Sequence, residues 1–213
     1  MEFVDIAEVR SELKARGVVE SPQADGGIAL VLAPVNAHAG EDRRAPMIVE
    51  LNASESAASN GAKHTVPCPV EHLAPTLETI LHKLHLTPLY VFPRATWRPI
   101  LDRVSFGLAS NEAWQEIDSQ ASLEQNTRDP LACGPRDLHT LRELVRALLA
   151  EGEPGPGVSI AIVATGQRLI AHVEPGLPIR IEVAHPQVAE QVRDAAMHFL
   201  HGVAGGSASR GSG

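Results

Sequence analysis

Histidine and cysteine side chains are concentrated in one stretch of the chain, residues 64–85. Neutral imidazole and ionised thiolate both bind zinc near neutral pH, and a zinc site needs three or four such ligands. The pattern therefore predicts a zinc site. With Glu78 as a base beside a metal-bound water, the same pattern would also predict a metal-dependent hydrolase. The candidate ligands are His64, Cys68, His72, His82 and His85.

A simpler interpretation of the same stretch is structural, and we favour it. Cys68 lies between Pro67 and Pro69, and the spacing matches no common zinc motif. On a helix, Glu78, His82 and His85 share one face opposite a stripe of leucines, which is typical of a solvated helix face. We therefore expect no cofactor, and zinc is the one cofactor that the sequence leaves open.

Two further polar groups are weaker candidates for a site. His198 and His201 fall in the last turns of a predicted helix, where the helix dipole favours histidine without any function. Residues 126–130, Asn-Thr-Arg-Asp-Pro, could present Arg128 and Asp129 to a ligand. Asn, Thr and Asp more often bond their own backbone in a turn, and we favour that interpretation. No nucleophile motif is present around Ser105 or the two cysteines.

The elements that must position these residues are helical in the middle of the chain. Apolar spacing predicts helices over residues 4–16, 71–86 and 96–108, with a short helix capped by Asn111. The most regular stripe predicts a helix over residues 138–149, with Leu144 at its centre. Short apolar runs predict strands over 28–33, 46–51 and 89–92, the first of them buried on both faces.

The C-terminal part predicts a three-stranded antiparallel meander. Its strands are residues 158–164, 167–174 and 179–183, joined by turns at Thr165-Gly166 and Pro175-Gly176. A helix over 186–201 follows and ends at Gly202, before a flexible Gly/Ser-rich tail, 205–213. We therefore expect one α+β domain over residues 1–204, with a helical middle, this meander plus helix, additional N-terminal strands, and a sub-boundary at 152–157.

Composition excludes several classes of function. The net charge is −8 and no basic stripe is present, so we expect no nucleic-acid binding. The longest uncharged apolar stretch, residues 28–35, is too short to span a bilayer, so no membrane association is expected. Two cysteines and an acidic N-terminus predict a cytoplasmic protein.

The leading functional prediction is an intracellular, non-enzymatic interaction or assembly protein that forms a homo-oligomer. Amphipathic elements outnumber convergent polar groups, and the alternating segment Ile179–Val183 could form a sheet edge. The alternative is the metal-dependent, hydrolase-like enzyme that would use the cluster at residues 64–85.

Overall fold

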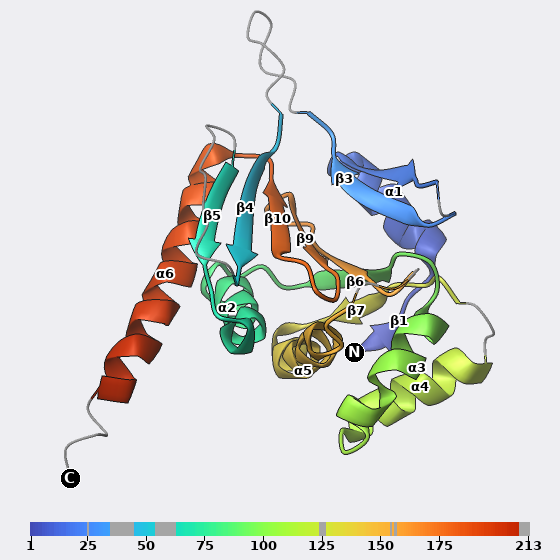
Figure 1. Cartoon of the computed structure of the whole chain (residues 1–213). Helices are drawn as coiled ribbons and strands as arrows, with labels where there is room; N and C mark the ends of the chain where they lie inside the picture. Colours follow the sequence, from blue (N-terminus) through green and yellow to red (C-terminus); the bar gives the residue numbers. More distant parts are fainter. Residues whose placement is uncertain are drawn as a thin grey trace, which may run out of the picture.

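The computed structural model describes residues 1–24, 26–34, 45–53, 63–123, 127–153, 155 and 157–208. In these ranges the chain forms six α-helices, one short 3-10 helix (η1, Pro135–Asp137) and ten strands. Eight strands form one mixed sheet and two form a separate hairpin (Figure 1). The α+β class predicted from the sequence is confirmed.

The main sheet is antiparallel except at one edge, where β4 and β5 run parallel. Its register is continuous, so alternate residues of every strand face either the helices or the opposite side. In spatial order the strands are β1 (Glu2–Phe3), β7 (Leu131–Cys133), β6 (Leu89–Pro93), β8 (Ile160–Ala164), β9 (Leu169–Val173), β10 (Ile179–Val183), β4 (Met47–Asn52) and β5 (Lys63–Pro67).

The C-terminal meander is confirmed, but the position of its last strand differs from the prediction. β8, β9 and β10 pair consecutively and antiparallel, and Gly176 has the positive φ, 71°, that its turn requires. β10 pairs with β9 on one side and with β4 on the other, so the prediction that Ile179–Val183 forms a sheet edge is wrong. The alternation of this segment indicates a strand with one polar face. A central strand shows the same alternation where one face of its sheet is left uncovered.

Helices cover one face of the main sheet (Figure 1). The largest core cluster lies between this face and the helices, and Leu144 at its centre is fully buried. The helix with the most regular apolar stripe therefore packs as predicted. The helices are α2 (Val70–Lys83), α3 (Trp97–Leu108), α4 (Glu112–Leu123), α5 (Leu138–Ala150) and α6 (Pro186–Ala208).

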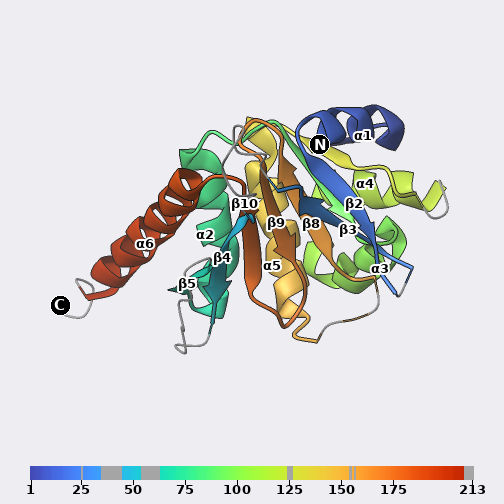
Figure 2. The same cartoon turned by 90° about the horizontal axis from the view of Figure 1, so that it is seen from above.

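The opposite face is covered over only part of its width. Helix α1 (Ile6–Ala15) and the hairpin of β2 (Val18–Pro22) and β3 (Ile28–Leu32) lie over the half formed by β6, β8 and β9 (Figure 2). Leu30 and Leu32 are buried there, whereas Ala29 and Val31 are half-buried. The expectation that the first strand is buried on both faces is therefore wrong, because it belongs to a hairpin outside the main sheet.

Several boundaries also differ from the predictions. Strands β1, β2, β5 and β7 were not predicted, and β7 directly follows the polar segment 126–130. Helix α6 continues past Gly202 to Ala208 and also includes Gly205 and Gly206, each at a cost of about 1 kcal/mol, so the predicted end at Gly202 is wrong. The last five residues of the expected tail, 209–213, lie outside the described residues. Within the described ranges, no helix is long and apolar enough to cross a bilayer.

Candidate functional site

The uncovered half of the main sheet carries charged side chains on the face that looks away from the helices. On this face His172 of β9 lies opposite Arg180 of β10, and Arg180 lies opposite Glu50 of β4. Glu182, two residues further along β10, shares the face. Beneath the hairpin the same face is apolar, as at Ile170, which is fully buried. The edge of the hairpin thus marks a change from an apolar to a charged surface.

Glu182 is the buried charge at this boundary. Its carboxylate accepts the Leu32 N–H at 3.5 Å, pairs with Arg180 Nη2 at 2.9 Å, and lies 3.6 Å from His172 Nε2. Burial raises the pKa of Glu182, but His172, Arg180 and the Leu32 N–H together lower it more, so the net pKa lies below its ordinary value. Glu182 is therefore a charged anchor for the hairpin.

The hydrogen bonds of the hairpin show which way each backbone group of β3 points. At one end Gln23 N–H donates to Gly27 O at 2.9 Å, and at the other Ala33 N–H donates to Gly17 O at 2.7 Å. Bonded pairs alternate along an antiparallel ladder. Ala29 and Val31 therefore exchange bonds with β2, and the even-numbered residues of β3 point their N–H and C=O groups away from it.

That outer edge of β3 is held at its two ends and free in its middle. Ile28 N–H donates to Arg94 O at 2.8 Å, and Leu32 N–H donates to the Glu182 carboxylate. Between them, the N–H and C=O of Leu30 have no hydrogen bond with any described residue. One strand edge is thus rigidly positioned and incompletely paired.

Two adjoining cavities lie along this edge. The smaller, about 90 Å³, lies between β3 and the sheet and is lined by Leu30, His172 and Arg128 among others. The larger, about 440 Å³, opens over β10 and β4, with Arg180 and Glu182 in its wall. Both cavities include Ala29, His172 and Glu174 in their linings, so we treat them as one site and call it the β3 trough.

Unsatisfied polar atoms converge on the trough. His172 Nε2 is buried and makes no hydrogen bond to the described residues, since its 3.6 Å separation from Glu182 exceeds hydrogen-bond length. It adds to the unpaired N–H and C=O of Leu30. Buried polar groups are normally hydrogen-bonded, so these atoms indicate a place where water or a ligand completes the bonding.

The polar loop after α4 bonds backbone groups, as one interpretation of its sequence predicts, and also presents Arg128 at the trough, as the other predicts. Asp129 N–H donates to Thr127 Oγ1 at 3.1 Å, and Asp129 Oδ1 accepts the Ile6 N–H at 3.2 Å. The predicted bonding of this loop to backbone groups is therefore present for its described residues. It leaves Arg128 exposed, with its side chain at the wall of the smaller cavity.

The predicted zinc ligands divide between two places, and the first lies beside α6. His64 Nε2 is 3.7 Å from Glu190 of α6. The ring of His72 contacts that of Phe199 edge-on at 6.4 Å between centroids. Cys68 is buried, with Sγ 3.5 Å from Thr76 Oγ1, and burial raises the pKa of its thiol. A protonated thiol is a poor metal ligand.

The other two predicted ligands, His82 and His85, are exposed at the far end of α2. Ten residues separate His72 from His82, which is roughly 15 Å along a helix axis, so the two cannot bind one ion. Within the described residues, no three or more His, Cys, Asp or Glu side chains are grouped so as to hold a metal ion. Zinc binding at residues 64–85 stays a prediction of the sequence.

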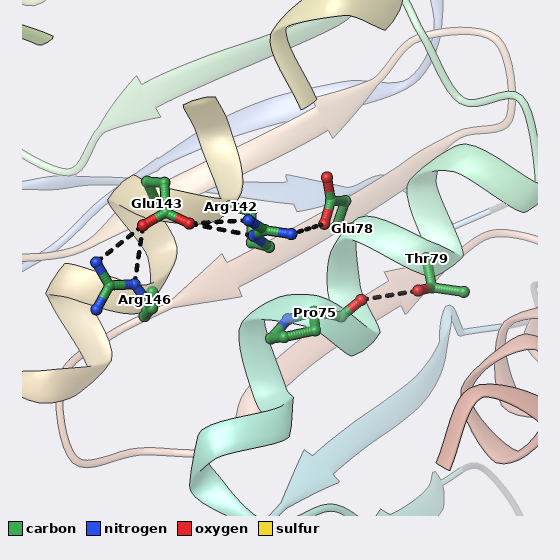
Figure 3. Close-up of polar contacts among 6 residues, drawn as sticks. All are labelled: Pro75, Glu78, Thr79, Arg142, Glu143 and Arg146. Carbon is green, nitrogen blue, oxygen red and sulfur yellow. Dashed lines mark hydrogen bonds and ion pairs between the residues drawn. The ribbon is translucent and has the colours of Figure 1, made fainter. Parts of the chain in front are cut away.

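Glu78, the proposed base of a metal-dependent enzyme, is engaged in an ion pair. Its carboxylate accepts from Arg142 Nη1 at 3.0 Å, and Arg142 also pairs with Glu143, which Arg146 contacts from the next turn (Figure 3). Burial raises the pKa of Glu143, but Arg142 and Arg146 together lower it by more, so the net pKa lies below its ordinary value. This network joins α2 to α5.

Pro75, in the second turn of α2, is accommodated locally. The hydroxyl of Thr79, one turn later, donates a hydrogen bond to Pro75 O at 2.9 Å (Figure 3). The proline lies on the half-buried side of α2, and the helix continues through it to Lys83. The helix predicted over residues 71–86 is therefore present as α2, Val70–Lys83, with Pro75 in its second turn.

Comparison of the chain with protein-family models, with curated proteins and with solved structures found no match. The candidate site therefore rests on its geometry. Sequence reasoning did not single out His172, Arg180 or Glu182. The available signal was the polar face of the alternating segment Ile179–Val183, which was interpreted as an edge.

Proposed function

We propose that this chain is a non-enzymatic interaction protein that binds an extended polypeptide segment of a partner along the free edge of β3. The observation that carries the proposal is the unpaired N–H and C=O of Leu30, a residue that lines the smaller cavity of the trough. Adding a strand to a sheet edge is a common mode of peptide recognition, and here the segment would enter the smaller cavity to reach these groups, because Leu30 is only 3% exposed. The unsatisfied Nε2 of His172 would form a further hydrogen bond with the bound segment.

The way β3 is held also supports strand addition. Arg94 O and the Glu182 carboxylate fix its two ends, so the edge is already ordered before a partner binds. A preformed edge costs less conformational entropy on binding than a mobile one. We place this interaction in the cytoplasm, and the two free, buried cysteines, Cys68 and Cys133, are consistent with a reducing compartment.

Selection from a displayed library of random heptapeptides tests strand addition. We expect sequences that bind the protein and that lose binding by at least about tenfold when Ala29→Trp fills the trough, since Ala29 lines both cavities. Ser21→Trp is the matched control. Ser21 lies opposite Ala29 on β2, is similarly half-buried and lines neither cavity.

The control variant should bind selected peptides as the parent protein does. Amide hydrogen exchange gives an independent check, because a bound strand should protect the Leu30 N–H from exchange. A selection that enriches no sequence, or peptides that bind Ala29→Trp as tightly as the parent, would remove strand addition as the function.

We also propose that the chain self-associates as a homodimer. The proposed contact surface is on α3 and α4, not on the strand edge expected from the sequence. Phe106 on α3 is 96% exposed. A hollow of about 50 Å³ lies between α3 and α4 and is lined in part by Leu101, Val104, Leu108 and Trp114. A projecting aromatic ring and an apolar hollow formed by the same pair of helices can be paired by a two-fold axis, so that the ring of each copy packs against the hollow of the other.

Light scattering coupled to size exclusion tests self-association. We expect a mass of about twice 22.7 kDa at micromolar concentration for the parent chain, and a mass near 22.7 kDa for Phe106→Ser. Val70→Ser is the control, because Val70 is also an exposed apolar residue, at 54%, and lies on α2 away from the hollow. A parent chain of 22.7 kDa at all concentrations contradicts the proposal.

A further inference from the structure

We propose that the segment bound in the β3 trough is acidic, with two carboxylates four residues apart on the side facing the main sheet. This inference rests on the proposed strand addition and specifies the chemistry of its partner. It follows from which charges of the trough face solvent and from where they lie along β3.

The cations at the open end of the trough are more exposed than the anions. The side chain of Arg180 is 49% exposed, whereas Glu182, its ion-pair partner, is 6% exposed. Glu50 is 17% exposed and is held by Lys63 at 2.8 Å. A bound segment therefore meets the guanidinium of Arg180 before it meets either carboxylate.

A second cation stands at the other end of the trough. Arg128 is exposed and lines the smaller cavity, and it takes part in no ion pair among the described residues. The nearby acidic groups are already engaged: Glu174 pairs with Arg94 at 3.8 Å, and Glu20 with Arg10 at 2.6 Å. In a chain of net charge −8, this unpaired cation is a local attraction for a carboxylate.

The neighbours of the two cations place them toward opposite ends of β3, which sets the expected spacing of the two carboxylates. Arg128 lines the cavity that includes Ile28, and Arg180 pairs with Glu182, which bonds Leu32. From Ile28 to Leu32 a strand advances roughly 13 Å, and side chains four residues apart on an extended chain share one face at that separation. The residue midway between the two carboxylates would lie at the level of Leu30, which lines the smaller cavity, so we expect a small aliphatic side chain there.

Fluorescence anisotropy with a labelled, end-capped peptide, Thr-Glu-Thr-Val-Thr-Glu-Thr, tests this pattern on the full chain. We expect this peptide to bind at least about tenfold more tightly than its counterpart with both Glu replaced by Gln, because charge-assisted hydrogen bonds are the stronger ones. Thr-Thr-Glu-Val-Glu-Thr-Thr has the same composition but places both carboxylates on the other face. It should bind as weakly as the Gln peptide.

Substitutions in the protein provide the second arm of the test. Arg128→Gln and Arg180→Gln should each weaken binding of the Glu peptide and leave the Gln peptide unchanged, which separates charge recognition from loss of folding. Arg146→Gln removes the same charge from α5, outside the trough, and should change neither affinity.

Two outcomes overturn the inference. Equal affinities for the Glu and Gln peptides show that the trough has no acidic preference, while strand addition still stands if the random library yields trough-dependent binders. Absence of binding by both peptides also overturns the acidic pattern, and the library selection then decides strand addition separately.

Discussion

Leu144→Ala is expected to lower the free energy of unfolding by about 2–5 kcal/mol, the usual range for truncating a fully buried leucine. Leu144 has no solvent exposure and lies at the centre of α5, between the main sheet and the neighbouring helices. The loss combines the transfer free energy of the removed methyl groups with a cavity that the close-packed surroundings cannot fill. Urea denaturation followed by circular dichroism measures it.

Leu177→Ala is the matched control for this prediction. Leu177 is 46% exposed in the turn before β10, so its truncation should change the free energy of unfolding by no more than about 0.5 kcal/mol. A denaturation midpoint for Leu144→Ala equal to that of the parent chain would show that the stripe of α5 does not form the core.

Glu182→Ala should destabilise the protein by about 1–3 kcal/mol, because it leaves the Leu32 N–H and the Arg180 guanidinium without their acceptor. The effect should be concentrated in the hairpin, since Glu182 anchors the end of β3. Amide exchange should therefore accelerate in β2 and β3 before it does in α5. Denaturation and hydrogen exchange together measure both parts.

The contribution of Glu182 should also depend on pH, with a sign that follows from its pKa. The folded pKa lies below the ordinary value, so the stabilisation is fully present above the unfolded glutamate pKa, about 4.3, and is lost as pH falls through the folded pKa. The stability difference between the parent chain and Glu182→Ala should thus shrink on acidification. Other acids, such as Glu143, affect both proteins equally and cancel in the difference.

Glu20→Ala provides the control on the same hairpin. Its ion pair with Arg10 is solvent-exposed, so its removal should cost less than about 1 kcal/mol and leave exchange in β3 unchanged. If Glu182→Ala had no larger effect than Glu20→Ala, the buried carboxylate would not be what holds the hairpin to the sheet.

The two substitutions test different parts of the protein, the helical core and the β3 trough. Leu144 tests the layer between the sheet and the helices, and Glu182 tests the attachment of the hairpin on the opposite face. A variant that loosens the hairpin should weaken peptide binding without unfolding the core. Comparing peptide affinity with global stability across Leu144→Ala and Glu182→Ala therefore separates the binding edge from the scaffold.

Local patterns in the sequence determined the elements whose stabilising contacts are close along the chain. The leucine stripe of α5 repeats at helical spacing, and the meander β8–β9–β10 is closed by short turns, so each was predicted with its approximate bounds. The cap of α4 was also predicted and is confirmed: Asn111 Oδ1 accepts the Trp114 N–H at 3.3 Å.

Tertiary structure alone decided the elements and the site that depend on distant pairing. β1 and β7 have two and three residues, too few for a periodic signal, and they exist as strands because they pair with each other and with β6. The alternating pattern of Ile179–Val183 is equally suited to an edge and to a central strand, and only pairing with β4 made it central.

The candidate site depends wholly on contacts between residues that are distant in the sequence. Its free edge arises because Ile28 bonds Arg94 and Leu32 bonds Glu182, contacts that span 66 and 150 positions of sequence. The histidines of residues 64–85 were close in sequence, but the rise of α2 separates His72 from His82, and the packing against α6 engages His64 and His72 elsewhere. Closeness in the sequence does not by itself bring side chains together, because strand register and helix geometry decide which of them meet in the folded chain.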